Sequence, residues 1–177
     1  MVKKLSIFLG YTLFFTLSLI YFTPKIALFY LAEKELNKFD LIISNEKIID
    51  SGFSLEVSDF NLYIKSIESA KVQDLDITIF GLYNRVILQN IVLSNTAKSF
   101  VPLNIYLVEA KYTIFNPLNA TATADGEFGK LDVTFNLLEM ALNIKLFPSE
   151  IMLKKYRSTM SQLSKNEDGS YSYAKNF

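Results

Sequence analysis

The sequence predicts a mainly β fold, an antiparallel and curved meander sheet, with an N-terminal transmembrane helix before it and a C-terminal helix near its end. Residues 5–22 contain no charged side chain. Between residues 40 and 147, apolar residues recur at alternate positions, and turn residues interrupt the pattern about every ten residues, which is typical of a strand meander. Near residue 150 the apolar period returns to that of a helix.

Residues 5–23 are the predicted membrane anchor. The uncharged run lies at the lower edge of the length that crosses a bilayer, where a helix satisfies its own backbone hydrogen bonds. Lys3 and Lys4 precede it, so we expect residues 1–4 to stay in the cytoplasm and the rest of the chain to lie across the membrane. The residues expected to face lipid are Leu5, Phe8, Leu13, Phe14, Phe15, Leu17, Leu19, Ile20, Tyr21 and Phe22.

A cleaved signal peptide is the main alternative for this segment, because it also has a positive start and an apolar core. However, residues 20–26 contain no small-x-small cleavage pair. Tyr21 and Phe22 also suit an aromatic belt at the membrane interface. A buried helix of a soluble protein is the third alternative. We favour the uncleaved anchor.

Residues 24–39 are predicted to form a juxtamembrane helix. Thr23 can cap it, and Pro24 is tolerated at the first helical position. Two arrangements remain: the membrane helix continues past a kink at Pro24, or a separate helix lies on the bilayer surface. The charges alternate in sign, which does not suit a basic surface helix, so we favour the continuous helix.

Residues 40–177 are predicted to form one β domain. Residues 41–43 and 47–49 flank a polar turn and indicate a short hairpin. Phase slips at Asp59 and near Asp74 are typical of bulges. The expected strands lie within residues 53–65, 70–79, 85–93, 104–115, 120–124, 129–137 and 142–147.

The last thirty residues are predicted to contain a helix and a final strand. Pro148 and Ser149 open a helix expected over residues 150–164, and residues 171–177 alternate as a strand. A terminal Phe after alternating aromatics also resembles the end of outer-membrane barrels. Lys175 interrupts that pattern, and the long anchor does not suit a barrel.

Composition argues against several kinds of chemistry. Eighteen basic and eighteen acidic residues cancel, so nothing indicates a nucleic-acid partner. The sequence has no His and no Cys, which removes the commonest metal ligand and general base, and it contains no phosphate-binding or nucleophile motif. We therefore predict no catalytic residues, no cofactor and no metal site, and a protein that is not an enzyme.

Two acidic pairs and the aromatic residues are the remaining candidates for a site. Asp74 and Asp76 share a strand face and could bind a cation, although a solvated face is the favoured interpretation. Glu167 and Asp168 precede Gly169, where a turn explains them. The aromatic residues could line a ligand groove, but packing in the core is favoured.

Residues Leu55 to Asp59, within the segment Gly52–Ile64, read Leu-x-Val-x-Asp, and the segment Val72–Leu93 continues with β-strand alternation. Both segments follow the anchor and a helix that ends in Glu-Lys-Glu-Leu. This layout resembles the N-protein family of type II secretion systems, which in turn resembles AsmA-like envelope proteins. The resemblance implies an inner-membrane anchor, a periplasmic β domain, and a role in secretion or envelope lipid handling. It offers no catalytic residues to transfer.

We expect a non-enzymatic, single-pass protein of the bacterial inner membrane, with its β domain in the periplasm. In this reading it is a component of a secretion or envelope transport complex, and its partners are the bilayer and other envelope or secretion proteins. The alternative is a lipid-binding or lipid-transfer module with an apolar groove on a curved sheet. A lipid carrier needs an uncovered apolar face, whereas a scaffold needs that face packed, so the position of residues 150–164 discriminates between them.

Overall fold

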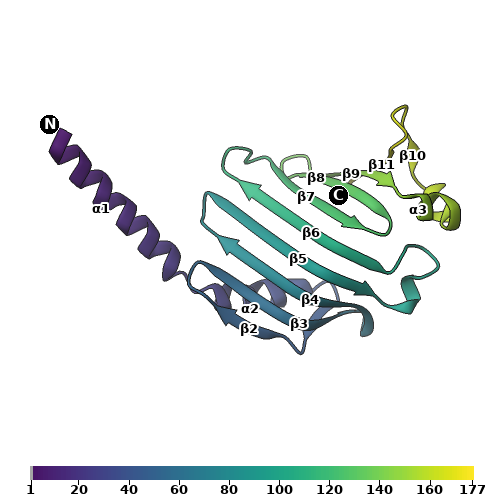
Figure 1. Cartoon of the computed structure of the whole chain (residues 1–177), viewed down its shortest axis with the longest axis horizontal. Helices are drawn as coiled ribbons and strands as arrows, with labels where there is room; N and C mark the ends of the chain where they lie inside the picture. The colour runs from purple at the N-terminus through teal and green to yellow at the C-terminus, as the bar shows by residue number, and fades with distance from the viewer. Residues whose placement is uncertain (1) are drawn as a thin grey trace.

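One open antiparallel sheet of eleven strands dominates residues 2–177, which a computed structural model describes (Figure 1). An N-terminal helix, α1 (Val2–Tyr21), projects away from one end of the sheet. Two short helices follow the ninth strand. The prediction of a mainly antiparallel β fold with an N-terminal apolar helix and C-terminal helical structure is confirmed.

Helix α1 is long and apolar enough to cross a membrane, and the side chains of its span from Lys3 to Tyr21 are not buried in the protein. The second helix, α2 (Lys25–Asn37), is separate, so the expectation of one continuous helix is wrong. Thr23 donates its hydroxyl to the Leu19 carbonyl at 2.8 Å and does not cap α2. Helix α2 packs on the sheet, where its Phe29 gains a buried position.

The strands form a meander in which almost every strand pairs with its neighbours in sequence. The spatial order is β1-β3-β4-β5-β6-β7-β8-β9-β11-β10, and β2 also pairs with β3. The strands are β1 (Leu41–Ser44), β2 (Lys47–Asp50), β3 (Ser54–Ile64), β4 (Ile67–Ile79), β5 (Tyr83–Leu93), β6 (Asn104–Thr113), β7 (Asn119–Gly126), β8 (Gly129–Asn136), β9 (Ala141–Pro148), β10 (Ser164–Lys165) and β11 (Tyr171–Asn176).

The predicted hairpin of residues 41–50 is wrong. Strands β1 and β2 both pair with β3 in one register, in which Ser44 lies opposite Asn61 and Lys47 opposite Ser58. They form a single edge strand interrupted at Asn45, whose φ is 66°. Strand β3 is long enough to form backbone hydrogen bonds with both β1 and β2, which have four residues each. A hairpin of β1 and β2 alone would be only marginally stable.

A row of irregular positions crosses the sheet at one level. Asp59 and Asn90 have φ values of 55° and 54°, and neither residue pairs with Gln73, which lies between them on β4. The phase slips predicted at Asp59 and near Asp74 are confirmed by burial, but the register is the same on both sides of each, so they are not the expected bulges. The register shift between β3 and β4 lies between Leu62 and Tyr63. Each slip shifts the side-chain phase by one, so Val57 and Phe60 are buried on the same face.

The strand register gives the sheet one apolar and one polar face. Partners in neighbouring strands point to the same side, so side chains align in rows. One such row runs Leu75, Leu88, Val108, Ala124, Leu131, Leu146, Tyr171, and the next runs Ile77, Val86, Ala110, Ala122, Val133, Ile144, Tyr173. We call this side the apolar face and the opposite side the polar face.

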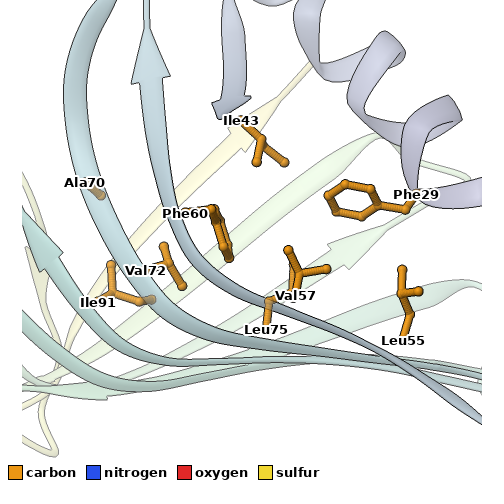
Figure 2. Close-up of a cluster of buried hydrophobic side chains, with 9 residues drawn as sticks. All are labelled: Phe29, Ile43, Leu55, Val57, Phe60, Ala70, Val72, Leu75 and Ile91. Atoms are coloured by element: carbon orange, nitrogen blue, oxygen red, sulfur yellow. The ribbon is translucent and has the colours of Figure 1, made fainter. Parts of the chain in front are cut away.

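Helices cover the apolar face at two places only. Helix α2 packs on β1, β2 and β3, and its Phe29 meets Val57 and Phe60 in the larger core cluster (Figure 2). At the opposite edge, Met152 and Met160 pack on Leu146 in a second cluster. These two clusters are the buried core of the described residues.

The C-terminal helical segment is divided, unlike the single helix expected over residues 150–164. Helix α3 (Glu150–Lys155) ends at Tyr156, and α4 (Arg157–Met160) follows it. Ser149 caps α3 by accepting a hydrogen bond from the Met152 amide at 3.2 Å. Tyr156 leaves helical geometry with φ −116° and ψ 40°, which turns the chain so that both methionines reach the sheet.

Candidate functional site

The middle of the apolar face is uncovered. Helix α2 lies over the β1–β3 edge, while α3 packs on β9. Between them, Val86, Ala110 and Val133 are only half-buried although they point to the same side as the cores. Contiguous exposed apolar surface is uncommon on soluble monomers, so this region is the candidate site.

A groove of about 240 Å³ lies in this uncovered region. Its floor is made by alanines: Ala110 and Ala122 are direct partners, and Val86 and Val133 stand on the strands beside them. Because methyl groups lie between larger side chains, the surface is hollowed along β6 and β7. The apolar side chains of its lining are Val86, Ala110, Tyr112, Ala120, Ala122, Val133 and Phe135.

A second apolar hollow, of about 190 Å³, lies under α3 and α4 on the same face. Leu131, Leu146 and Met152 contribute to its lining. Ala124, the next inward-facing residue of β7 after Ala120 and Ala122, packs against this cluster. The line of alanines therefore connects the open groove to the covered hollow.

On the polar face, charged and hydroxyl side chains alternate along β6 and β7 with the residues that line the groove. Glu109 pairs there with Arg85 and, at 2.7 Å, with Lys111. The hydrogen bond from Lys111, followed by that from Arg85, lowers the pKa of Glu109 below its ordinary value despite some desolvation. Thr121 and Thr123 are exposed on this face of β7. Strand β7 therefore presents threonine hydroxyls on the polar face and alanine methyl groups on the apolar face.

The predicted acidic pairs lie away from the groove. Asp74 and Asp76 are on the polar face, where Glu56 is directly opposite Asp76 beside a hollow of about 360 Å³. Among the residues that the structure describes, no group of three His, Cys, Asp or Glu side chains could hold a metal ion. Asp76 accepts a hydrogen bond from the Thr78 hydroxyl at 3.1 Å, a contact within its own strand.

The other acidic pair, Glu167 and Asp168, lies in the turn before β11. Asp168 accepts hydrogen bonds from Lys145 at 2.7 Å and from the Ser170 amide at 3.0 Å. These bonds, with that of Lys145 the largest effect, hold the pKa of Asp168 well below its ordinary range. Its role is to fix the turn that starts β11.

The predicted anchor residues lie on α1, except for Phe22, which directly follows it. Ile20 is half-buried, and the others are between 44% and 78% exposed. They are Leu5, Phe8, Leu13, Phe14, Phe15, Leu17, Leu19, Tyr21 and Phe22. This continuous apolar exposure leaves α1 without a protein core to pack into.

A buried joint, which the sequence did not indicate, fastens α1 to the sheet. Lys25 is only 1% exposed, and its Nζ donates to the carbonyl of Ile20 at 3.0 Å and to that of Gly52. The Tyr21 ring lies over Gly52, where any Cβ would collide with it, and meets Phe53 edge-on at 5.5 Å. A cation at the carboxyl end of α1 is also favoured by the helix dipole.

Comparisons with family models, with curated proteins and with solved structures find no match to this chain. The resemblance of residues 52–64 and 72–93 to the secretion N-protein and AsmA-like families therefore stays a prediction.

Proposed function

We propose that this protein is a membrane-anchored lipid-binding module whose apolar face holds the acyl chain of a membrane lipid. The uncovered groove over Ala110, Ala120 and Ala122 carries the proposal, because it offers apolar lining without a polar cleft for chemistry. The helical segment 150–164, which decides between carrier and scaffold, covers only the far part of the face. An acyl chain is the ligand whose shape and polarity suit such a trough.

The energetics suit reversible uptake. Burying one methylene from water stabilises a complex by about 0.8 kcal/mol, so a chain seated in the groove is strongly held against release into water. A chain that moves from a bilayer into the groove exchanges one apolar environment for another, and its transfer free energy is close to zero. Exchange with the membrane is therefore easy, while escape into water is not.

In this proposal α1 is an uncleaved anchor in a bacterial inner membrane. Residues 1–4 lie in the cytoplasm and residues 40–177 in the periplasm, as the position of Lys3 and Lys4 favours. The joint at Lys25 keeps the groove at a fixed place relative to the membrane. The role is non-enzymatic, with the bilayer and a lipid as partners.

A role as a component of a secretion or envelope transport complex is the second candidate. The outer edge of β11 supports it, because β10 pairs only with Tyr171 and Ser172. Among the described residues, no strand pairs with the outer edge of residues 173–176, so a partner could add a strand there. Such a strand would extend the apolar face, so the two roles are compatible.

Lipid analysis of the purified full-length protein tests the proposal. After extensive washing in a nonionic detergent, solvent extraction and mass spectrometry should recover phospholipid in a fixed ratio to protein. The control is a peptide of residues 1–24, which contains α1 without the sheet, carried through the same washes. A lipid-to-protein ratio no higher than that of the peptide would contradict the proposal.

A further inference from the structure

The turns at the α1 end of the sheet form a line of exposed apolar side chains. Strand register places the turns after β2, β4, β6 and β8 at this end, and Figure 1 shows the turns after β4 and β6 on the side of α1. Phe115 is 92% exposed and Leu138 is 76% exposed. We define the rim as Phe53, Phe80, Leu82, Phe115, Leu118 and Leu138.

Charge separates the rim from the opposite end of the sheet. Residues 51–53, 80–82 and 114–118 contain no charged side chain, and Glu139 is the single one in residues 137–140. At the opposite end, the turns carry Lys65, Lys98 and Glu127. Phe39, Ile67 and Phe100 are exposed at that end too, but each has a charged residue within two positions in the sequence. Only the α1 end has the composition of a surface that enters an apolar phase.

The joint aligns the rim with the membrane helix. Tyr21, on the last turn of α1, contacts Phe53, which is itself a rim residue. Lys25 ties the end of α1 to Gly52 in the same turn. A bilayer crossed by α1 therefore has its surface close to the level of the rim, and aromatic side chains are favoured at that level.

We propose that the rim inserts into the interface of the bilayer that α1 crosses, so that the sheet stands on the membrane by its turns. The rim would contact lipid at the level where the headgroups meet the acyl chains. Insertion removes Phe115, Leu138 and their neighbours from water, which is favourable for each large side chain buried. The three turns without charge cross this boundary without desolvating an ion.

Seating the rim in the bilayer opens the groove to lipid. Tyr112, Ala120 and Phe135 line the groove and lie in the row nearest the turns after β6 and β8. An acyl chain can then pass along the sheet from the bilayer without crossing water. Insertion of the rim requires only the part of the proposed function in which α1 anchors the protein in a membrane. The path for the acyl chain also requires that the groove binds lipid.

Site-specific fluorescence in lipid nanodiscs tests the insertion. The chain has no cysteine, so single substitutions Phe115→Cys, Leu138→Cys and, at the opposite end, Lys98→Cys each accept one polarity-sensitive label. With full-length protein in phosphatidylethanolamine and phosphatidylglycerol discs, labels at the first two sites should emit at shorter wavelength. They should be quenched by nitroxide lipids and be several-fold less sensitive to iodide than the label at residue 98.

Iodide sensitivity at residues 115 and 138 equal to that at residue 98 would overturn insertion and leave the rim as a surface for a protein partner. The same labels in an Ala122→Trp background separate the two proposals. That substitution fills the groove and leaves the rim untouched, so insertion should persist even where lipid uptake is lost. Loss of rim protection in this variant would count against an independent membrane contact.

Discussion

Replacing Ala122 with Trp is expected to empty the groove of lipid. Ala122 lies on the groove floor between Ala110 and Val133, and an indole is large against a volume of about 240 Å³. Lipid recovered with the purified full-length protein should fall at least about tenfold, which corresponds to about 1.4 kcal/mol of lost binding free energy. The measurement is phospholipid per protein by mass spectrometry.

Thr123→Trp is the matched control for this variant. Thr123 is the next residue of the same strand, but it lies exposed on the polar face between Glu109 and Asp132. It should retain the lipid content of the parent protein. Both positions border solvent, so neither change should alter the free energy of unfolding by more than about 1 kcal/mol. Equal lipid content in the two variants would show that the groove is not the binding site.

Replacing Lys25 with Met is expected to loosen the joint between α1 and the sheet. The change leaves the Gly52 carbonyl without its buried donor, whereas the Ile20 carbonyl keeps the hydrogen bond from the Thr23 amide at 3.3 Å. An unsatisfied buried carbonyl costs about 1–3 kcal/mol, and the free energy of unfolding should fall by that amount. Chemical unfolding of the full-length protein in detergent micelles measures this loss.

A distance measurement separates a loosened joint from a general loss of stability. Spin labels at Leu19→Cys on α1 and Ser58→Cys on β3 should give a narrow distance distribution in the parent and a broad one with Lys25→Met. Lys34→Met is the control, because Lys34 is exposed on the same helix. If both substitutions left narrow distributions and equal stabilities, the joint would have no role in orienting the sheet.

The sequence predicted what local pattern controls. The uncharged run gave α1, and alternation gave the strands from β3 to β9 and the final strand β11. The slip at Asp59 was also visible, because the positive φ of that residue shifts the apolar alternation by one residue. Even the groove had a local signal in Ala120, Ala122 and Ala124, which alternate with threonine on the opposite face.

Features that depend on distant partners could not be predicted. Residues 44–46 have the composition of a turn, yet they only interrupt one edge strand. The reason is that β1 and β2 both pair with β3 and not with each other. The burial of Lys25 could not be predicted either, because its acceptor at Gly52 lies 27 residues away in the sequence. The rim likewise exists only once the register brings alternate turns to one end of the sheet.

Photo-crosslinking from the groove wall tests whether a lipid occupies the apolar face of the sheet. A benzophenone amino acid at Phe135 on the apolar face is compared with the same group at Phe147, a Phe on the polar face of β9, opposite Lys130. In membranes, lipid adducts should form at residue 135, be several-fold fewer at residue 147, and fall at residue 135 when Ala122→Trp fills the groove. Equal adducts at both positions, or adducts at residue 135 that Ala122→Trp leaves unchanged, would contradict a lipid held on the apolar face.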